Sequence, residues 1–316
     1  MIFIIGAPRS GTKLLRQILN NHSQIYIPEA ETMFLYKLYL SWDQFKDLSD
    51  RNNFDELVQY ILETPFYSYL KEEHSEKIID FDKWYSSCSE WSYSHVMMKF
   101  FEICAFHYGK SMFGDKTPSY LYPIDFIRNQ FKEVRIIHIV RDPRDYVLSV
   151  NKAWGKNIFR SAQRWNDWLN LVNKDLGLKE DNILVTYENL LSNSEKETER
   201  ILSFLKISYE PNLFVFNGQI EPVGDAKNEG KIKKDNFGKW KRELSSNKLR
   251  IIEELCYQNL KDLGYKIELG KKQKKLSNIK FIYYKGLDSL SLLIYAYKRK
   301  GYLGLKRQLK LMIFSK

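Results

Sequence analysis

Short hydrophobic runs typical of buried strands recur along the chain and alternate with segments of helical periodicity. The strand-like runs are Ile2–Ile5, Ile25–Ile27, Met112–Gly114, Val134–Val140 and Ile183–Tyr187. After the first of them, hydrophobic residues recur at helical spacing from 14 to 19, and similar patterns follow later runs. Strands that alternate with helices predict a parallel sheet with helices on both faces, and therefore the α/β class.

Two segments depart from this alternation. Residues from about 35 to 108 are rich in Tyr, Trp and Phe, and we predict that they form a mostly helical insertion. Residues 217–238 are rich in Gly, Lys and Asn and predict a long loop, which is often a functional element in a compact domain. We therefore expect one α/β domain over 1–270, followed by a C-terminal tail over 271–316.

The excess positive charge of the chain is concentrated in this tail. The formal net charge is +11, yet 271–316 carries 13 of the 50 Lys and Arg and only one of the 39 Asp and Glu, so the remainder is close to neutral. The tail also contains an apolar stripe at helical spacing, formed by Leu287, Leu290, Leu293, Ile294 and Tyr297. A basic amphipathic helix suits an anionic membrane surface, whereas a helix packed on the body or on a partner protein explains the same pattern. Nucleic-acid binding is not expected.

Composition narrows the setting in which the chain works. A hydrophobic content of 44% excludes a disordered chain. Cys88, Cys104 and Cys256 lack the spacing of metal ligands, so we expect no metal site and a reducing compartment. The first predicted strand begins at Ile2, which leaves no room for a signal peptide. The expected location is the cytoplasm. If the tail binds a membrane surface, we expect peripheral attachment at the inner membrane face.

The loop Gly6–Thr12 joins the first strand to the first helix. Backbone N–H groups and the positive end of a helix dipole converge at such a turn, which favours an anion. A nucleotide-triphosphate loop ends in Gly-Lys-Ser/Thr, where the Lys reaches the β- and γ-phosphates and the hydroxyl binds magnesium. Here Thr12 stands in place of that Lys, and Arg9 lies inside the loop. The loop therefore predicts an anionic ligand that binds without magnesium.

A second anion site is predicted after the strand Val134–Val140. Arg141 follows the strand directly, and Asp142 and Pro143 are typical of the N-cap and first residue of a helix. Ser149 falls about two helical turns later, and an Arg with a hydroxyl group can bind a phosphate. Because the carboxyl ends of parallel strands share one edge of a sheet, we expect both loops at that edge.

These two motifs resemble those of sulfotransferases that use 3′-phosphoadenosine 5′-phosphosulfate (PAPS), specifically bacterial proteins similar to the tyrosylprotein sulfotransferases. Residues 8–12 resemble the 5′-phosphosulfate loop of that family, and 140–145 with Ser149 resemble its 3′-phosphate motif. Further matches are Pro28–Thr32, Gly114–Pro118, Val185–Leu190 and Lys239–Leu244. The resemblance covers roughly 2–265 and implies a P-loop-type, three-layer α/β/α fold.

The resemblance also implies which residues bind the donor. The candidate cofactor-binding residues are Arg9, Ser10, Gly11, Thr12, Lys13, Arg141, Ser149 and Tyr187. The first five would surround the 5′-phosphosulfate, and the Arg141–Ser149 pair would bind the 3′-phosphate. Tyr187 would line the adenosine side of the site, or else serve only as a packed strand end.

Three residues are candidates for catalysis on the same resemblance. Arg9 and Lys116 would stabilise charge on the transferring group or the bridging oxygen, and Glu31 would take the proton from the acceptor hydroxyl. The segment contains one residue more than the family pattern, so Glu29 is the alternative base. Sulfuryl transfer resembles phosphoryl transfer in its loose, in-line transition state, so positioning and charge stabilisation supply most of the catalysis.

The predicted function is therefore transfer of a sulfuryl group from PAPS to a hydroxyl acceptor. A glycan or glycolipid is the favoured acceptor, and a tyrosyl peptide, a small alcohol or a phenol is an alternative. A P-loop kinase of small molecules would need magnesium and a Lys at position 12, whereas Lys13 lies one residue too late. A non-catalytic, membrane-tethered nucleotide-binding module would bind the ligand without turnover and would tolerate Glu31→Gln.

Overall fold

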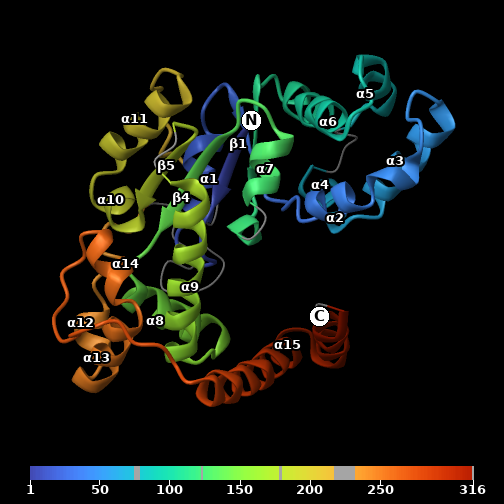
Figure 1. Ribbon diagram of the computed structural model, residues 1–316. Helices are drawn as coiled ribbons and strands as arrows, with labels where there is room; N and C mark the ends of the chain where they lie inside the picture. Colours follow the sequence, from blue (N-terminus) through green and yellow to red (C-terminus); the bar gives the residue numbers. More distant parts are fainter. Residues whose placement is uncertain (75–78, 122–123, 178–179, 217–231, 315–316) are drawn as a thin grey trace. The chain divides into compact units, whose positions relative to one another are not determined.

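The computed structural model describes residues 1–74, 79–121, 124–177, 180–216 and 232–314 (Figure 1). Most of the predicted loop 217–238 lies outside these residues. The described parts form two compact units. The first unit contains 1–140, 172–216 and 232, and the second contains 141–171 and 233–314.

The first unit is built on a five-stranded sheet in which every pair of neighbouring strands is parallel. Its strands are β1 (Ile2–Ile5), β2 (Ile25–Tyr26), β3 (Met112–Lys116), β4 (Arg135–Val140) and β5 (Asn182–Thr186). Their order is β2-β3-β1-β4-β5, so β1 lies at the centre. The predicted strands and the parallel sheet are confirmed. Since β1 and β4 are neighbours, with Ile5 beside His138, their carboxyl ends share one edge.

Helices cover both faces of this sheet. One face is buried by α1 (Thr12–Asn20), α10 (Tyr187–Ser192) and α11 (Ser194–Leu205), which share a hydrophobic cluster with alternate residues of β1 and β4. The other face lies against η2 (Pro118–Leu121), α6 (Tyr93–His107) and the chain that follows α7 (Ile124–Gln130). There Phe3 meets the rings of Tyr120 and Phe131. The predicted three-layer α/β/α arrangement is therefore confirmed.

The segment between β2 and β3 is helical, as predicted. Before α6 it contains α2 (Leu35–Leu40), η1 (Trp42–Phe45), α3 (Arg51–Leu62), α4 (Pro65–His74) and α5 (Phe81–Ser87). Aromatic rings join these helices, because Phe54 of α3 packs 4.7 Å from Trp84 of α5. The Trp84 indole in turn donates a 2.8 Å hydrogen bond to the Val96 carbonyl of α6. The aromatic side chains of the insertion thus form a hydrophobic core of their own.

The second unit is helical. It contains α8 (Pro143–Trp154), most of α9 (Ile158–Leu176), α12 (Trp240–Glu243), α13 (Ser246–Leu255), α14 (Tyr257–Asp262) and α15 (Asn278–Phe314). Asp142 caps α8 by accepting the Arg144 N–H, with Pro143 at the first turn, as predicted. Buried Arg144 forms ion pairs with Asp142 (2.7 Å) and Glu253 (2.8 Å) and stacks on Trp240. This network ties α8 to α13.

The basic C-terminal helix predicted from the sequence is present as α15. It begins at Asn278, and the predicted domain boundary at 270 stays a prediction. Its only acidic residue, Asp288, is buried in an ion pair with Arg160 of α9. Among the described helices, none combines the length and the apolar character needed to cross a membrane.

Candidate functional site

The loop that follows β1 has the geometry of an anion site. Arg9 and Gly11 both have positive φ, at 78° and 95°, which turns the chain sharply before α1. Gly11 is the N-cap of α1 and provides no side-chain cap, so the first N–H groups of the helix are left for another acceptor. Ser10 is fully buried, and its Oγ has no hydrogen-bond partner within the described structure. A ligand oxygen would satisfy these donors.

Two glycines allow this loop to lie tightly against the sheet. A Cβ on Gly6 would lie 2.5 Å from the Ile139 carbonyl oxygen of β4. A Cβ on Gly11 would lie 2.4 Å from the ring of Tyr187. Tyr187 is buried in the hydrophobic cluster, so its ring supports the loop from the core. This position agrees with the packed alternative for Tyr187, and a role in nucleotide binding stays a prediction.

Lys116 and Glu31 form a close ion pair in the first unit. The Lys116 Nζ donates to Glu31 Oε1 at 2.5 Å. Lys116 is the last residue of β3, beside Ile4 of β1, and its side chain is 3% exposed, whereas that of Glu31 is 35% exposed. The pair therefore joins the buried ammonium group of Lys116, at the end of β3, to a carboxylate that solvent can reach.

The alternative base, Glu29, has a different partner. Its carboxylate pairs with Lys13 Nζ at 2.9 Å, and its side chain is half exposed. Partial burial acts to raise the pKa of Glu29, but the hydrogen bond and charge of Lys13, with the nearby charges of Arg16 and Lys116, lower it overall. The structure thus separates the two carboxylates, because each is paired with its own lysine.

Asp115 supports this region from inside the sheet. It is fully buried, and its Oδ1 accepts hydrogen bonds from the Thr32 N–H (3.3 Å) and the Thr117 hydroxyl (3.0 Å). Burial raises its pKa to about 7. Asp115 thereby fixes the backbone directly after Glu31. Sequence reasoning did not assign it a role, although it precedes Lys116 in a matched motif.

A cavity of about 710 Å³ adjoins the two lysine–glutamate pairs. Its lining residues are Lys13, Glu29, Ala30, Glu31, Met33, Phe34, Pro65, Phe66, Tyr69, Glu72 and Lys116. The lysines of this lining thus come from the start of α1 and the end of β3, whereas its glutamates and apolar groups come from the chain after β2 and from α4. Lys13, Glu29, Glu31 and Lys116 were predicted site residues, whereas the wall residues of α4 have no local signal beyond the aromatic composition of the insertion.

Arg141 and Ser149 belong to the second unit. Arg141 is buried, its Nη2 donates to the Asn236 carbonyl (3.2 Å), and its own carbonyl accepts from the Trp165 indole (3.1 Å). Ser149 is partly buried within α8. The loop 6–12 belongs to the first unit, so joint binding of one ligand by both motifs stays a prediction.

Asp145 is a further organising residue that the sequence did not reveal as such. It accepts the backbone N–H groups of Gly238 (2.5 Å) and Trp240 (3.0 Å). Burial raises the pKa of Asp145, and the charge of Arg141 partly opposes this effect. Asp145 thereby ties α8 to the segment that contacts Arg141. Within the described residues, no three His, Cys, Asp or Glu side chains gather as a metal site would require.

Comparison with known proteins identifies relatives that are similar in sequence. The nodulation protein NoeE of Sinorhizobium fredii is 22% identical over 301 residues, which cover 84% of this chain and 66% of that protein. Human carbohydrate sulfotransferase 1 is 25% identical over 177 residues, which cover 47% of this chain and 43% of that protein. These matches span two thirds or less of each relative.

Structural similarity extends over most of the fold. The sulfotransferase domain from the curacin biosynthetic pathway superposes with a TM-score of 0.58 at 18% identity, covering 85% of this chain and 98% of that domain. Residues 2–211 match the profile described as "Sulfotransferase family". This region contains the sheet, the loop after β1 and the Glu31–Lys116 pair. The chain therefore belongs to the sulfotransferase family.

Proposed function

We propose that the protein transfers a sulfuryl group from PAPS to a hydroxyl group of an acceptor. The observation that carries the proposal is the Glu31–Lys116 ion pair, which lies on a cavity that also reaches Lys13 in the first turn of α1. Donor-loop residues, a candidate base and room for an acceptor therefore lie within one unit. This combination is what a direct, in-line transfer requires.

The loop fits the anionic end of such a donor. Arg9, the unpartnered Ser10 hydroxyl and the uncapped N–H groups at the start of α1 are all donors. They would bind the 5′-phosphosulfate, while Arg141 and Ser149 would bind the 3′-phosphate. PAPS itself supplies the activated sulfuryl group. The missing Lys at position 12 agrees with a ligand that has no β- and γ-phosphates to bridge.

Glu31 is the base in this proposal, and Lys116 provides positive charge. The Glu31 carboxylate faces the cavity and would accept the proton of the acceptor hydroxyl. The Lys116 ammonium is nearly inaccessible, and a buried charge needs a partner. It is therefore held at the cavity by Glu31 and available to stabilise negative charge that develops there.

The cavity walls support an acceptor with an apolar face. Met33 and Tyr69 are more than half exposed beside buried Phe34 and Phe66. Aromatic rings of this kind can stack on the apolar face of a sugar ring or contact a lipid chain. Together with the carbohydrate sulfotransferase among the relatives, this favours a glycan or glycolipid, and a tyrosyl peptide is the alternative.

Donor binding is tested with 3′,5′-adenosine bisphosphate, the product of PAPS. We expect magnesium-independent binding that is lost in Arg141→Ala. Tighter binding of ATP that requires magnesium would contradict the proposal and favour a small-molecule kinase. Acceptors are tested by transfer of labelled sulfate from PAPS to oligosaccharides, a glycolipid extract and tyrosyl peptides.

The base is tested by comparing two matched variants. Glu31→Gln is expected to lower kcat by about 10²–10⁴-fold and to leave affinity for adenosine bisphosphate unchanged. Glu29→Gln, the control, removes the carboxylate that pairs with Lys13 and should retain most of the activity. The reverse ranking would make Glu29 the base. Binding without transfer to any acceptor class would indicate a non-catalytic module.

A further inference from the structure

The C-terminal helix α15 uses one of its faces to dock on the second unit. The docked residues recur every three or four positions and are Phe281, Tyr284, Asp288 and Ser291. Asp288 accepts the Asn157 N–H at 2.6 Å and pairs with Arg160. The Arg160 guanidinium also lies 5.1 Å from the ring of Phe281. This docked face fixes the rotation of the helix about its axis.

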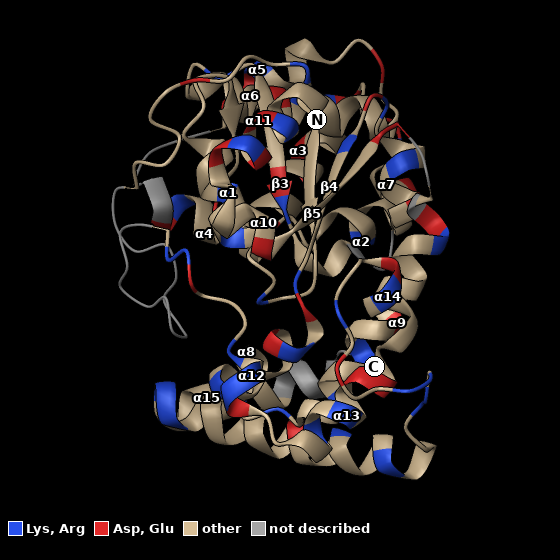
Figure 2. Ribbon diagram, turned by 90° about the vertical axis from the view of Figure 1, so that its left-hand side faces the viewer, with Lys and Arg blue, Asp and Glu red and all other residues tan. Residues whose placement is uncertain are grey.

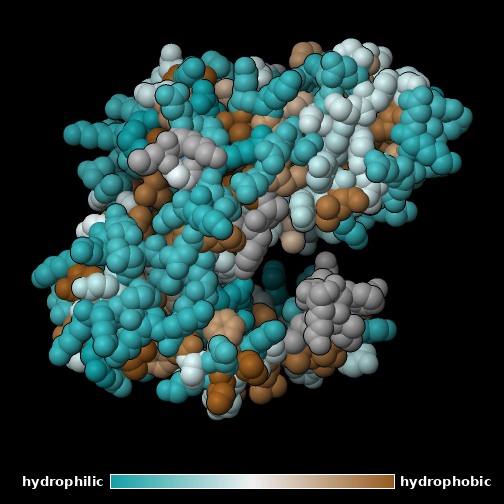
Figure 3. All heavy atoms as spheres, in the orientation of Figure 1, coloured by the Kyte–Doolittle hydropathy of each residue, from teal (hydrophilic) through white to brown (hydrophobic). Residues whose placement is uncertain are grey.

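A second stripe of α15 is apolar and exposed. Its residues are Ile279, Ile282, Tyr283, Leu287, Leu290, Ile294 and Tyr297, and each is between 41% and 82% exposed. They too recur every three or four positions, except that Ile282 and Tyr283 are adjacent. With about 3.6 residues per turn, this outward stripe lies on the side of the helix away from Asp288. Figure 3 shows hydrophobic patches along α15.

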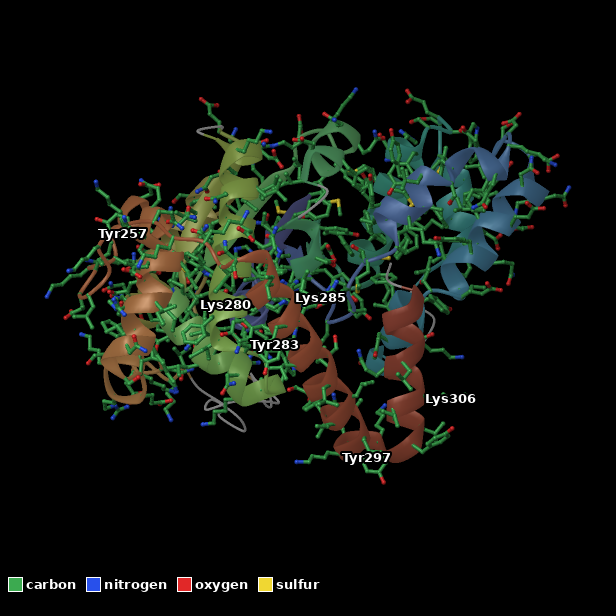
Figure 4. The ribbon with its side chains drawn as sticks, turned by 60° about the horizontal axis from the view of Figure 1, so that its bottom comes forward. Tyr257, Lys280, Tyr283, Lys285, Tyr297 and Lys306 are labelled. Atoms are coloured by element: carbon green, nitrogen blue, oxygen red, sulfur yellow. The ribbon has the colours of Figure 1, made fainter. Side chains whose placement is uncertain are left out.

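Such a row is not ordinary surface. Exposed hydrophobic residues on soluble proteins are normally scattered singly, and a contiguous row marks a surface that binds something. The helix bends at Lys300 and Gly301, where φ is −137° and 58°. Beyond the bend, Tyr302 and Leu303 are both more than 70% exposed. Figure 4 shows Tyr283 before the bend, Tyr297 close to it and Lys306 after it.

The charges on α15 indicate what the stripe binds. Exposed basic residues recur along α15, namely Lys280, Lys285, Lys298, Arg299, Lys300 and Lys306 (Figure 2). With about 3.6 residues per turn, Lys280 and Lys298 border the outward stripe. The single acid, Asp288, is already neutralised by Arg160. The presented surface is therefore both apolar and positive. A second copy of the chain, paired through the same stripe, would bring like charges together, whereas anionic lipid headgroups would complement them.

We propose that the outward stripe of α15 binds an anionic membrane surface. The helix lies along the interface, with its apolar side chains at the boundary between headgroups and acyl chains and its lysines among the headgroups. Tyr283 and Tyr297 are amphipathic residues that suit this depth. The docked face, through Asp288 and Arg160, connects the lipid-bound helix to the second unit. This activity is separate from sulfuryl transfer.

The proposal is tested by sedimentation of the full chain with vesicles. We expect binding to phosphatidylcholine mixed with phosphatidylglycerol and much weaker binding to phosphatidylcholine alone, with affinity falling as salt is raised. Replacing Ile282, Leu290 and Ile294 together by Gln should weaken binding at least about ten-fold. Replacing Lys280 and Lys298 by Gln should cost about five-fold for each lysine on anionic vesicles only.

The control replaces exposed leucines outside the tail, Leu40→Gln and Leu184→Gln, and should bind vesicles as the unchanged chain does. Equal binding by the triple variant, or no preference for anionic lipid, would overturn the proposal. The proposal would also fail if the unchanged chain binds no vesicles and instead forms a dimer that the triple variant converts to a monomer. Sulfate transfer to a soluble acceptor, measured in parallel, should be unaffected by the triple substitution. Loss of vesicle binding is thus distinguishable from failure of the proposed enzymatic activity.

Discussion

The buried carboxyl of Asp115 should make the stability of the protein fall as the pH rises toward neutrality. Burial raises its pKa from 3.8 to about 7, so the folded state retains a proton that the unfolded chain releases. The sign follows from proton binding, because stability decreases with pH wherever the folded state binds more protons. The contribution is fully present below about pH 4 and is lost as the pH rises through about 7.

The substitution Asp115→Asn isolates this effect. Asn resembles the protonated carboxyl in shape and keeps an oxygen for the Thr32 N–H and the Thr117 hydroxyl. A difference of about three pKa units corresponds to about 4 kcal/mol. The variant and the unchanged protein should therefore be similarly stable at pH 4, and the variant should be more stable by up to about 4 kcal/mol at pH 8.

Urea unfolding at a series of pH values measures this difference directly. Because other groups titrate equally in both proteins, the difference between the two curves reports Asp115 alone. Thr117→Val is the control. It removes the hydroxyl that donates to Asp115 and accepts the Thr32 N–H, but it keeps the buried carboxyl, so stability should still fall as the pH rises. Parallel curves for Asp115→Asn and the unchanged protein would refute the reasoning, as would a variant that is less stable at pH 8.

Two further substitutions test the packing of each unit. Gly11→Ala places a Cβ 2.4 Å from the Tyr187 ring at φ 95°, whereas Gly109→Ala, at φ 66°, meets no atom within 4 Å. We expect Gly109→Ala to lower the free energy of unfolding by roughly 1–2 kcal/mol. Gly11→Ala should lower it clearly more and should also weaken adenosine bisphosphate binding. Equal losses of stability in thermal unfolding would contradict this expectation. Glu253→Gln weakens the buried pair with Arg144 and should cost about 3 kcal/mol. An unchanged melting temperature would show that the pair is not stabilising.

The sheet was predictable from the sequence because each strand carries a local signal. A run such as Ile136–Val140 is apolar except at His138, and the residues that follow it, Arg141 to Pro143, are typical of a strand end and a helix start. The loop Gly6–Thr12 was also predictable, since glycines are typical of a loop whose backbone lies close to neighbouring atoms. These features depend on residues that are close together in the chain, and a single sequence shows such local patterns directly.

Features that depend on distant residues were not predictable. Asp115 looks like one charged residue among many until the burial of β3 raises its pKa. The cavity wall from Met33 to Tyr69 depends on how α4 packs, which no local pattern specifies. The tail illustrates the same limit, because the periodicity of α15 showed an apolar stripe but not which residues dock and which stay exposed.

The buried ion pairs of Arg144 extend beyond the part of the chain that matches the family profile. The family match stops at residue 211, but Glu253 binds Arg144 and also accepts the N–H groups of 268, 269 and 270. A chain shortened at the edge of the recognised family would therefore leave Arg144 without one of its two carboxylates at the start of α8. The unit that folds therefore extends beyond the unit that sequence comparison recognises, because Glu253 pairs with buried Arg144 and Asp288 pairs with Arg160.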